Sequence, residues 1–138
     1  MQRYLAVWNT HDGSQVATFM ADDVTYEDLA GGATYYGRDE VAGYVAATHE
    51  WSSDYRFVIV AAQSSSTGYA IEWEMIGTNT GEFGGTAPTG KPYRIRGVSV
   101  GRLNEDGQIA SNRDYFNLVD YLAQVGLFTP PGADVAGT

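Results

Sequence analysis

The hydrophobic pattern of the chain changes its period near residue 54, and this change limits the folds that are open to it. Before that point the apolar residues recur at helical spacing, most clearly over residues 38–51. After it, β-branched and aromatic residues alternate with polar ones, which is the period of a strand. Helices followed by a run of strands predict an α+β fold with the helices gathered against a sheet.

Two short helices are expected at the start of the chain. Tyr4, Leu5 and Trp8 share one side of the first helix, and Asp12-Gly13 ends that pattern. The second helix is expected over Gln15–Met20.

One strand and one longer helix follow. The alternation in Asp23–Leu29 predicts a strand that ends at Gly31-Gly32. The segment Arg38–Trp51 predicts the longest helix, with Asp39 and Glu40 in its first turn, where acidic side chains interact favourably with the helix dipole.

The second half of the chain predicts an antiparallel sheet and one closing helix. Turn-forming segments rich in glycine, serine and asparagine separate four expected strands: Asp54–Ala62, Gly68–Thr80, Lys91–Leu103 and Gln108–Phe116. Asn117 is expected to cap a helix over Leu118–Val125, which Gly126 ends. Residues 1–128 thus form one expected domain, and residues 129–138 a flexible tail.

Composition and charge exclude several kinds of partner. The chain has 17 acidic and 8 basic residues, and a formal net charge of −9 repels nucleic acid and anionic membrane surfaces. It contains no cysteine, no apolar run long enough to span a membrane and no visible signal peptide. We therefore expect a cytoplasmic protein that binds neither nucleic acid nor membrane.

The sequence offers little support for a metal or a cofactor. His11 and His49 have no carboxylates at a recognisable metal-binding spacing. Ser99 lacks a histidine and an acid at the offsets of a hydrolytic triad, and the glycine-rich segment Gly81–Gly90 lacks the spacing of a phosphate loop. We expect no metal site and no cofactor.

Strand alternation indicates which polar side chains face a pocket. Asn112, Asp114 and Phe116 share one face of the last strand, and a sheet curled around helices would turn that face inward. Glu72 and Glu74 share one face of an earlier strand, which is either the pocket face or a solvated surface, since a slip of one residue inverts the choice.

Four segments of the sequence resemble the SnoaL-like polyketide cyclases, also called ester cyclases. They are Gly77–Phe83, Pro88–Lys91, Arg96–Ser99 and Asp106–Ile109, and the resemblance extends from Tyr4 to Gly126. It implies an NTF2-like cone: three N-terminal helices packed in a strongly curved mixed or antiparallel sheet, with a short C-terminal helix. It also implies a homodimer formed through the open face of the sheet.

The segment Arg113–Asn117 is also similar to the end of limonene-epoxide hydrolase. Both families place a catalytic aspartate where Asp114 stands. In the cyclases this residue is the general acid/base of an intramolecular aldol closure, and in the hydrolase it donates a proton to the epoxide oxygen. An apolar cavity would raise the pKa of such a carboxyl group. The alternative is a structural carboxylate that caps the closing helix or pairs with Arg113 or Arg96.

The match to the hydrolase is partial. Tyr26 matches its tyrosine, and Asp28 is a near match to its asparagine. Glu74 could replace its aspartate, but Glu72 reverses the charge of its arginine. Asn112 stands where the cyclases often have a histidine. An amide can orient a substrate carbonyl, but it cannot relay a proton.

These observations predict a cofactor-free acid/base enzyme for a small, mostly apolar substrate, with polyketide-type cyclisation as the leading reaction. The expected catalytic residues are Asp114, Glu74 and Asp28, and the expected substrate-binding residues are Tyr26, Glu72, Asn112, Trp8, Tyr44 and Phe116. Epoxide hydrolysis or epoxide-opening cyclisation stays open, as does a non-catalytic module that binds a small ligand or dimerises. If the carboxylates converge, at least one pKa must rise.

Overall fold

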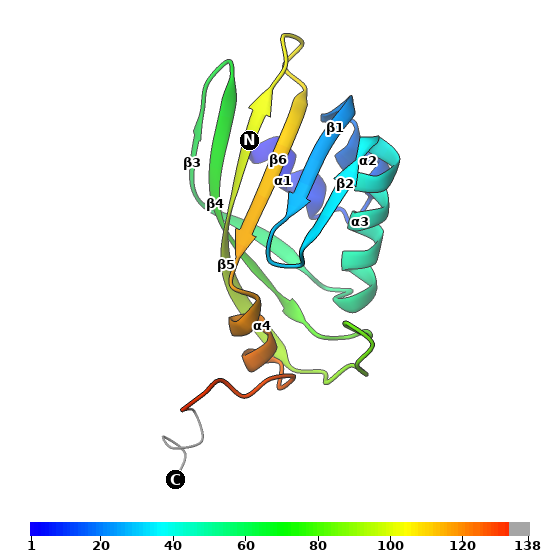
Figure 1. The fold of residues 1–138 in the computed structure, drawn as a ribbon, viewed down its shortest axis with the longest axis vertical. Helices are drawn as coiled ribbons and strands as arrows, with labels where there is room; N and C mark the ends of the chain where they lie inside the picture. Colours follow the sequence, from blue (N-terminus) through cyan, green and yellow to red (C-terminus); the bar gives the residue numbers. More distant parts are fainter. Residues whose placement is uncertain (133–138) are drawn as a thin grey trace.

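The computed structural model describes residues 1–132, which form four helices and six strands (Figure 1). In chain order these are α1 (Gln2–Trp8), α2 (Gly13–Ala17), β1 (Met20–Asp28), β2 (Ala33–Tyr36), α3 (Gly37–Trp51), β3 (Arg56–Ser64), β4 (Gly68–Thr78), β5 (Pro92–Leu103), β6 (Ile109–Phe116) and α4 (Leu118–Gln124). The α+β class predicted from the sequence is confirmed.

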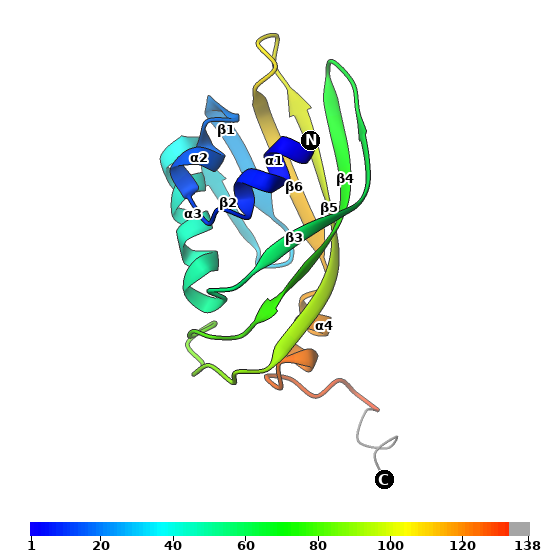
Figure 2. The same cartoon turned by 180° about the vertical axis from the view of Figure 1, so that it is seen from behind.

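The six strands form a single mixed sheet in the order β2-β1-β6-β5-β4-β3. The neighbours are antiparallel except β1 and β6, which run parallel. Helices α1, α2 and α3 lie together on one side of the sheet, and α4 follows β6 at one end (Figures 1 and 2). The parallel pair sets Asp28 directly across from Asp114, although the two lie far apart in the sequence.

Two predictions near the N-terminus need correction. The second helix runs over Gly13–Ala17 and not over Gln15–Met20. It starts at Gly13 because the Asp12 carboxylate accepts the backbone N–H groups of Ser14 and Gln15, and it ends before Met20 because that residue pairs with Ile109 of β6. Met20 already belongs to β1 and is fully buried. The four-residue strand β2 was not predicted, since it is too short for its alternation to stand out and depends on pairing with β1.

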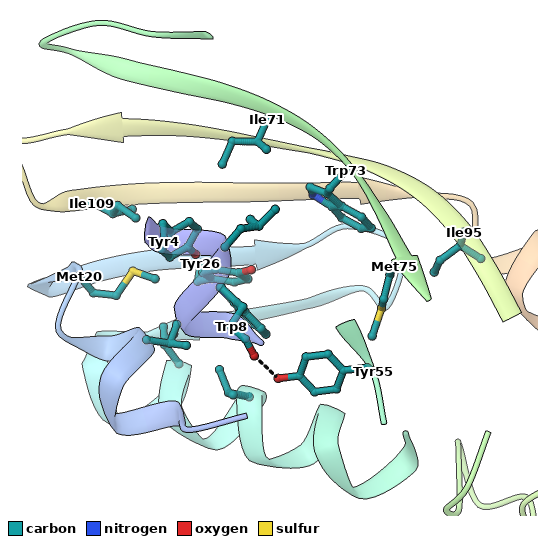
Figure 3. Packing of buried hydrophobic residues seen from close by; sticks show 14 of the residues in the cluster. Tyr4, Trp8, Met20, Tyr26, Tyr55, Ile71, Trp73, Met75, Ile95 and Ile109 are labelled. Carbon is teal, nitrogen blue, oxygen red and sulfur yellow. Dashed lines mark hydrogen bonds between the residues drawn. The ribbon is translucent and has the colours of Figure 1, made fainter. Parts of the chain in front are cut away.

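The core lies between the three N-terminal helices and the sheet (Figure 3). Tyr4 and Trp8 of α1 face Ile71 and Trp73 of β4, and all four are buried. The Tyr55 hydroxyl donates a hydrogen bond of 3.0 Å to the backbone oxygen of Trp8. Helix α1 is too short to persist alone, so this packing holds it in place.

Two glycines of β5 allow the rings of Trp73 and Tyr69 to lie over the sheet. A Cβ atom at Gly97 would lie 2.2 Å from the Trp73 ring, and one at Gly101 would lie 2.1 Å from the Tyr69 ring. The missing side chains therefore let both rings cover the backbone of β5. This arrangement brings the polar ends of Trp73 and Tyr69 towards β5 and β6.

The chain continues beyond α4 without a further helix or strand up to residue 132. Residues 129–132 belong to no helix or strand, and residues 133–138 of the predicted tail lie outside the described residues. Within the described part, every helix is too short or too polar to cross a membrane.

Candidate active site

A cavity of about 240 Å³ opens between α1, α3 and the inner face of the sheet. More than half of the residues that line it are aromatic, and its carboxyl groups are those of Asp28 and Asp114. Within residues 1–132 no lysine, arginine or histidine lines it. The cavity is therefore an apolar space with acidic groups and no cationic counterpart.

Asp114 of β6 is the most completely bonded group in this cavity. Its Oδ1 accepts hydrogen bonds from the Ser99 hydroxyl at 2.6 Å and from the Asn112 amide at 2.8 Å. Its Oδ2 accepts a hydrogen bond from the Tyr26 hydroxyl. All of these donors are neutral, so the carboxyl group has no ion-pair partner among them.

The donors to Asp114 are themselves held in place. The Trp73 Nε1–H group donates to the Ser99 hydroxyl oxygen at 2.9 Å. The Tyr69 hydroxyl donates to Asn112 Oδ1 at 2.6 Å, which orients the amide nitrogen towards Asp114. Fully bonded buried networks fix the orientation of their members. The position of the carboxyl group is thus determined by rings that Gly97 and Gly101 admit.

Burial raises the pKa of Asp114 above its ordinary value of 3.8. The hydrogen bonds from Ser99, Tyr26 and Asn112 lower the pKa, and the nearby negative charge of Asp28 raises it, so the net effect is an increase. A carboxyl group with a raised pKa can both accept and donate a proton closer to neutral pH.

Hydrogen-bond chemistry also indicates which oxygen of Asp114 carries that proton. Oδ1 already accepts two hydrogen bonds, and one of its donors, the Asn112 amide nitrogen, can only donate. Oδ2 faces the Tyr26 hydroxyl, which can donate to a carboxylate or accept from a carboxylic acid. These contacts favour Oδ2 as the oxygen that carries the proton of the neutral form.

Asp28 lies beside Asp114 and closes the β1–β2 turn. Its Oδ1 accepts the backbone N–H of Gly31 at 2.9 Å, and its Oδ2 accepts the Tyr44 hydroxyl at 3.1 Å. A Cβ atom at residue 31 would lie 2.7 Å from Oδ2, so a larger residue there would push the Asp28 carboxylate away from its present position.

The structure brings most of the predicted site residues together. The cavity wall contains Asp114, Asp28, Tyr26, Trp8, Tyr44 and Phe116. Asn112 lies behind Asp114 and contacts it without lining the cavity. The structure shows that these residues lie close together. Their catalytic and substrate-binding roles stay predictions.

Glu72 and Glu74 lie on the opposite face of β4, so the expected cluster of four carboxylates does not form. The alternation of β4 turns the large apolar side chain of Trp73 into the core, and its neighbours Glu72 and Glu74 must then point outward. Glu74 forms an ion pair of 2.6 Å with Arg94. The solvated-surface alternative is the one that the structure contains.

Neither structural alternative for Asp114 is present. Arg113 pairs with Glu27 at 3.3 Å on the outer face of the sheet. Asn117 caps α4 by accepting the backbone N–H of Asp120 at 3.0 Å. Within the described structure, Asp114 therefore neither caps the closing helix nor forms an ion pair with an arginine.

Sequence reasoning did not foresee the roles of Ser99, Trp73 and Tyr69 in positioning Asp114. Ser99 could have been found, because it follows Tyr93 and Ile95 at every second position and so shares their buried face. The hydrogen bonds from Trp73 and Tyr69 carry no such signal, since they cross between strands.

Tyr4 adds a free polar group to the cavity wall. Its hydroxyl is buried and has no hydrogen-bond partner among the described residues. Burial raises its pKa above the ordinary value of 10.0, and the Asp114 charge raises it further. Buried donors without a partner are rare in folded proteins, and they are candidates for contact with a ligand.

The two histidines lie apart from the cavity. The His11 and His49 rings stack with their centroids 4.5 Å apart, and His11 Nε2 lies 2.7 Å from the backbone oxygen of Tyr55. No group of three or more metal-ligating side chains comes together in the part of the chain that the structure describes.

Comparison with known proteins identifies a family and a fold. Residues 1–112 match the sequence model of the SnoaL-like domain. A comparison with curated proteins finds no match.

Solved structures resemble the chain over nearly its whole length. A protein of ketosteroid isomerase-like fold from Catenulispora acidiphila, in complex with trimethylamine, is 28% identical and has a TM-score of 0.81, with 94% of this chain and 95% of that chain covered. A protein proposed to be a polyketide cyclase from Xanthomonas campestris is 26% identical, with a TM-score of 0.75 and coverage of 90% and 92%.

A third similar structure, proposed to be a SnoaL-like polyketide cyclase from Jannaschia, is 16% identical and supports the fold alone. Its TM-score is 0.77, with 94% of this chain and 92% of that chain covered. Together with the family match, these structures confirm the expected NTF2-like fold.

Proposed function

The chain belongs to the family of SnoaL-like domains, and on that premise we propose that it is a cofactor-free acid/base enzyme for a small, mostly apolar molecule. One observation carries the proposal: the buried Asp114 carboxyl group lies in an aromatic cavity, is held by neutral donors and has a raised pKa. A group in this state can take a proton from carbon and return it to oxygen.

The proposed reaction is a polyketide-type aldol closure. The Asp114 carboxylate removes a proton from the carbon beside a substrate carbonyl, which leaves an enolate. The enolate carbon forms a bond to a second carbonyl carbon of the same molecule, and the resulting alkoxide takes the proton back from Asp114. The free Tyr4 hydroxyl is a donor in the cavity wall that can stabilise the enolate oxygen.

The proteins proposed to be polyketide cyclases that share this fold support this reaction class. The epoxide-hydrolase alternative receives less support. The arginine of that pattern has no counterpart, because Glu72 stands in its place and points outward, and no cation lines the cavity within residues 1–132. Asp28 would contribute to the site mainly through its charge.

A second candidate function is ligand binding without catalysis. The Catenulispora relative was solved with trimethylamine, which indicates that a protein similar to this chain over most of its length can hold a small organic molecule. The two functions differ in their dependence on Asp114. Replacement by asparagine should slow proton transfer by orders of magnitude, whereas it should leave the affinity of a simple binder nearly unchanged.

The deciding experiment is a carboxyl-carbon NMR titration of the wild type and of Asp114→Asn. We expect one aspartate to titrate above the ordinary value of about 4 and to be absent from the variant. Exchange of the α-protons of 2-tetralone in D₂O, followed by proton NMR, then tests proton transfer at carbon. Glu74→Gln is the matched control, because it removes a carboxylate outside the cavity.

Normal titration of every carboxyl group would remove the basis of the acid/base proposal and favour the binding function. A raised pKa without catalysed exchange would restrict the proposal to substrates other than simple ketones. Catalysed exchange that persists in Asp114→Asn would assign the proton transfer to another group.

We also propose that the chain forms a homodimer through the outer face of the sheet. Val58, Val100 and Tyr115 lie on that face and are each at least 40% exposed. Light scattering should then give twice the chain mass of 14.9 kDa. Val100→Lys should reduce the mass to that of one chain, because an ammonium group at the centre of such a surface is costly to bury.

A further inference from the structure

We propose that the cavity selects a ligand that carries an alkylammonium group, held beside Asp28 by the surrounding aromatic rings. The inference depends on the proposed function only in that it uses the same cavity. It names the chemical class of the ligand, and it gives Asp28 and Asp114 different tasks: recognition of charge and transfer of a proton.

The carboxylate of Asp28 has no counter-ion among residues 1–132. Asp28 is 8% exposed, and its hydrogen-bond donors are the Gly31 backbone and the Tyr44 hydroxyl, both neutral. Its neighbour across the sheet is the acidic Asp114. A buried carboxylate without a cation is unfavourable, so a cationic ligand would gain by supplying the missing charge.

The arginines of the adjacent strand β6 and of helix α3 are engaged elsewhere. Arg38 of α3 pairs with Asp22 at 2.9 Å, and Arg113 of β6 pairs with Glu27. Within residues 1–132 no arginine lines the cavity. The chain as a whole carries a formal charge of −9, which also draws cations rather than anions towards it.

A cluster of aromatic rings begins beside Asp28 with Tyr44, whose hydroxyl donates to Asp28 Oδ2. The centroid of the Tyr44 ring lies 4.6 Å from that of Tyr35, 5.4 Å from that of Tyr26 and 6.1 Å from that of Trp8. All four rings line the cavity. Tyrosine and tryptophan faces attract ammonium groups, and the rings also supply the apolar contacts that N-methyl groups need.

Other classes of ligand fit the cavity less well. A phosphate or carboxylate would meet two acidic groups and no cation in the described wall. A wholly apolar ligand would remove water from Asp28 without compensation. The cavity has a volume of about 240 Å³. One water molecule takes about 30 Å³, so the cavity has room for several water-sized groups and therefore for a small trimethylalkylammonium group.

The test compares choline with 3,3-dimethylbutan-1-ol, which has the same shape but carbon in place of the charged nitrogen. Isothermal titration calorimetry on the intact chain should show at least tenfold tighter binding of choline. Asp28→Asn should reduce the ratio of the two affinities to below threefold. Glu72→Gln removes the same charge from the outer face, and it should leave the ratio unchanged.

A second pair of variants covers the case that Asp28→Asn does not fold. Tyr44→Leu removes the ring beside Asp28 and should lower the ratio, whereas Tyr44→Phe keeps the ring and should preserve most of it. Asp114→Asn should retain the preference for choline even where it abolishes proton transfer. The ammonium inference and the acid/base proposal can therefore fail independently.

Equal affinities for the two compounds would overturn the inference, as would the absence of any binding of choline. A choline preference that survives both Asp28→Asn and Tyr44→Leu would also overturn it, because the cation would then bind elsewhere. A preference lost equally in Glu72→Gln would show that net charge, not the cavity, attracts the ligand.

Discussion

The two faces of the sheet carry the same kind of acidic residue in opposite circumstances. Asp114 on the inner face is 6% exposed, accepts hydrogen bonds from neutral donors and has a raised pKa. Glu74 on the outer face is 19% exposed and pairs with Arg94, whose side chain is 63% exposed. The surroundings of a carboxylate, and not its residue type, thus decide whether it is suited to chemistry.

The largest difference between the faces should appear in catalysis. Asp114→Asn should lower the rate of proton exchange or cyclisation by about 10²- to 10⁴-fold, the range that general acid/base groups contribute. Glu74→Gln should stay within about twofold, since it leaves the cavity intact. Rates are measured by NMR or by product formation. Comparable losses in both variants would contradict the distinction between the faces.

Removal of a donor behind Asp114 should affect both stability and titration. Ser99→Ala leaves the buried Trp73 N–H without an acceptor and should cost about 1–3 kcal/mol of unfolding free energy. It should also raise the pKa of Asp114 further, because the Ser99 hydrogen bond favours the charged form.

Urea unfolding and carboxyl NMR measure these two effects of Ser99→Ala. Ser65→Ala, in the exposed turn between β3 and β4, is the matched control and should change stability by less than about 0.5 kcal/mol. An unchanged Asp114 pKa in Ser99→Ala would show that this hydrogen bond does not tune the carboxyl group.

The pH dependence of stability should have opposite signs at Asp114 and at the surface residue Asp54. The folded state raises the pKa of Asp114, so its contribution is complete below the ordinary value of 3.8 and is lost as pH rises through the folded pKa. The stability advantage of wild type over Asp114→Asn should therefore shrink as pH rises between these two pKa values, by about 1.4 kcal/mol per pH unit.

Asp54 should show the reverse. Partial burial alone would raise its pKa, but hydrogen bonds from Thr78 and Ser52 outweigh it and hold the pKa below 3.8. Its stabilising contribution is present above 3.8 and is lost as pH falls through the folded pKa. Unfolding curves of Asp54→Asn and Asp114→Asn across pH 3–8 give the change of each residue's stabilising contribution with pH. Changes of equal sign would contradict the predicted difference between the two carboxyl groups.

The smallest effect is expected from the outer ion pair. In the Val100→Lys background, in which the proposed dimer is absent, Glu74→Gln should cost no more than about 1 kcal/mol, because the Arg94 side chain is 63% exposed and solvent screens the pair. The loss should decrease further in 1 M NaCl. A loss well above about 1 kcal/mol in urea unfolding of this monomeric background would contradict the prediction.

The sequence predicted the part of the site that depends on alternation within one strand. The placement of Asn112, Asp114 and Phe116 on a single face follows from a period of two, and the structure has them so. For β4 the same rule left the choice between the two faces open. The choice depended on which face the core covers, and the burial of Trp73 decided it.

Contacts between distant segments could not be predicted in this way. Asp28 lies across from Asp114 only because β1 and β6 pair in parallel, and no local pattern specifies that pairing. The network through Trp73 and Tyr69 likewise depends on two glycines of another strand. Such contacts are set when the strands assemble, since each requires a partner from elsewhere in the chain.

The sequence by itself determined the α+β class, the positions of the long helix α3 and of the strands β3 to β6, and the inward face of β6. Local periodicity and turn residues carry that information, because they act within a few residues. Only the tertiary structure decided that Asp28 and Asp114 share a cavity without a cation, and that Glu72 and Glu74 do not. Burial and charge compensation depend on what the rest of the chain places around a residue, so they exist only once the sheet has closed over the helices.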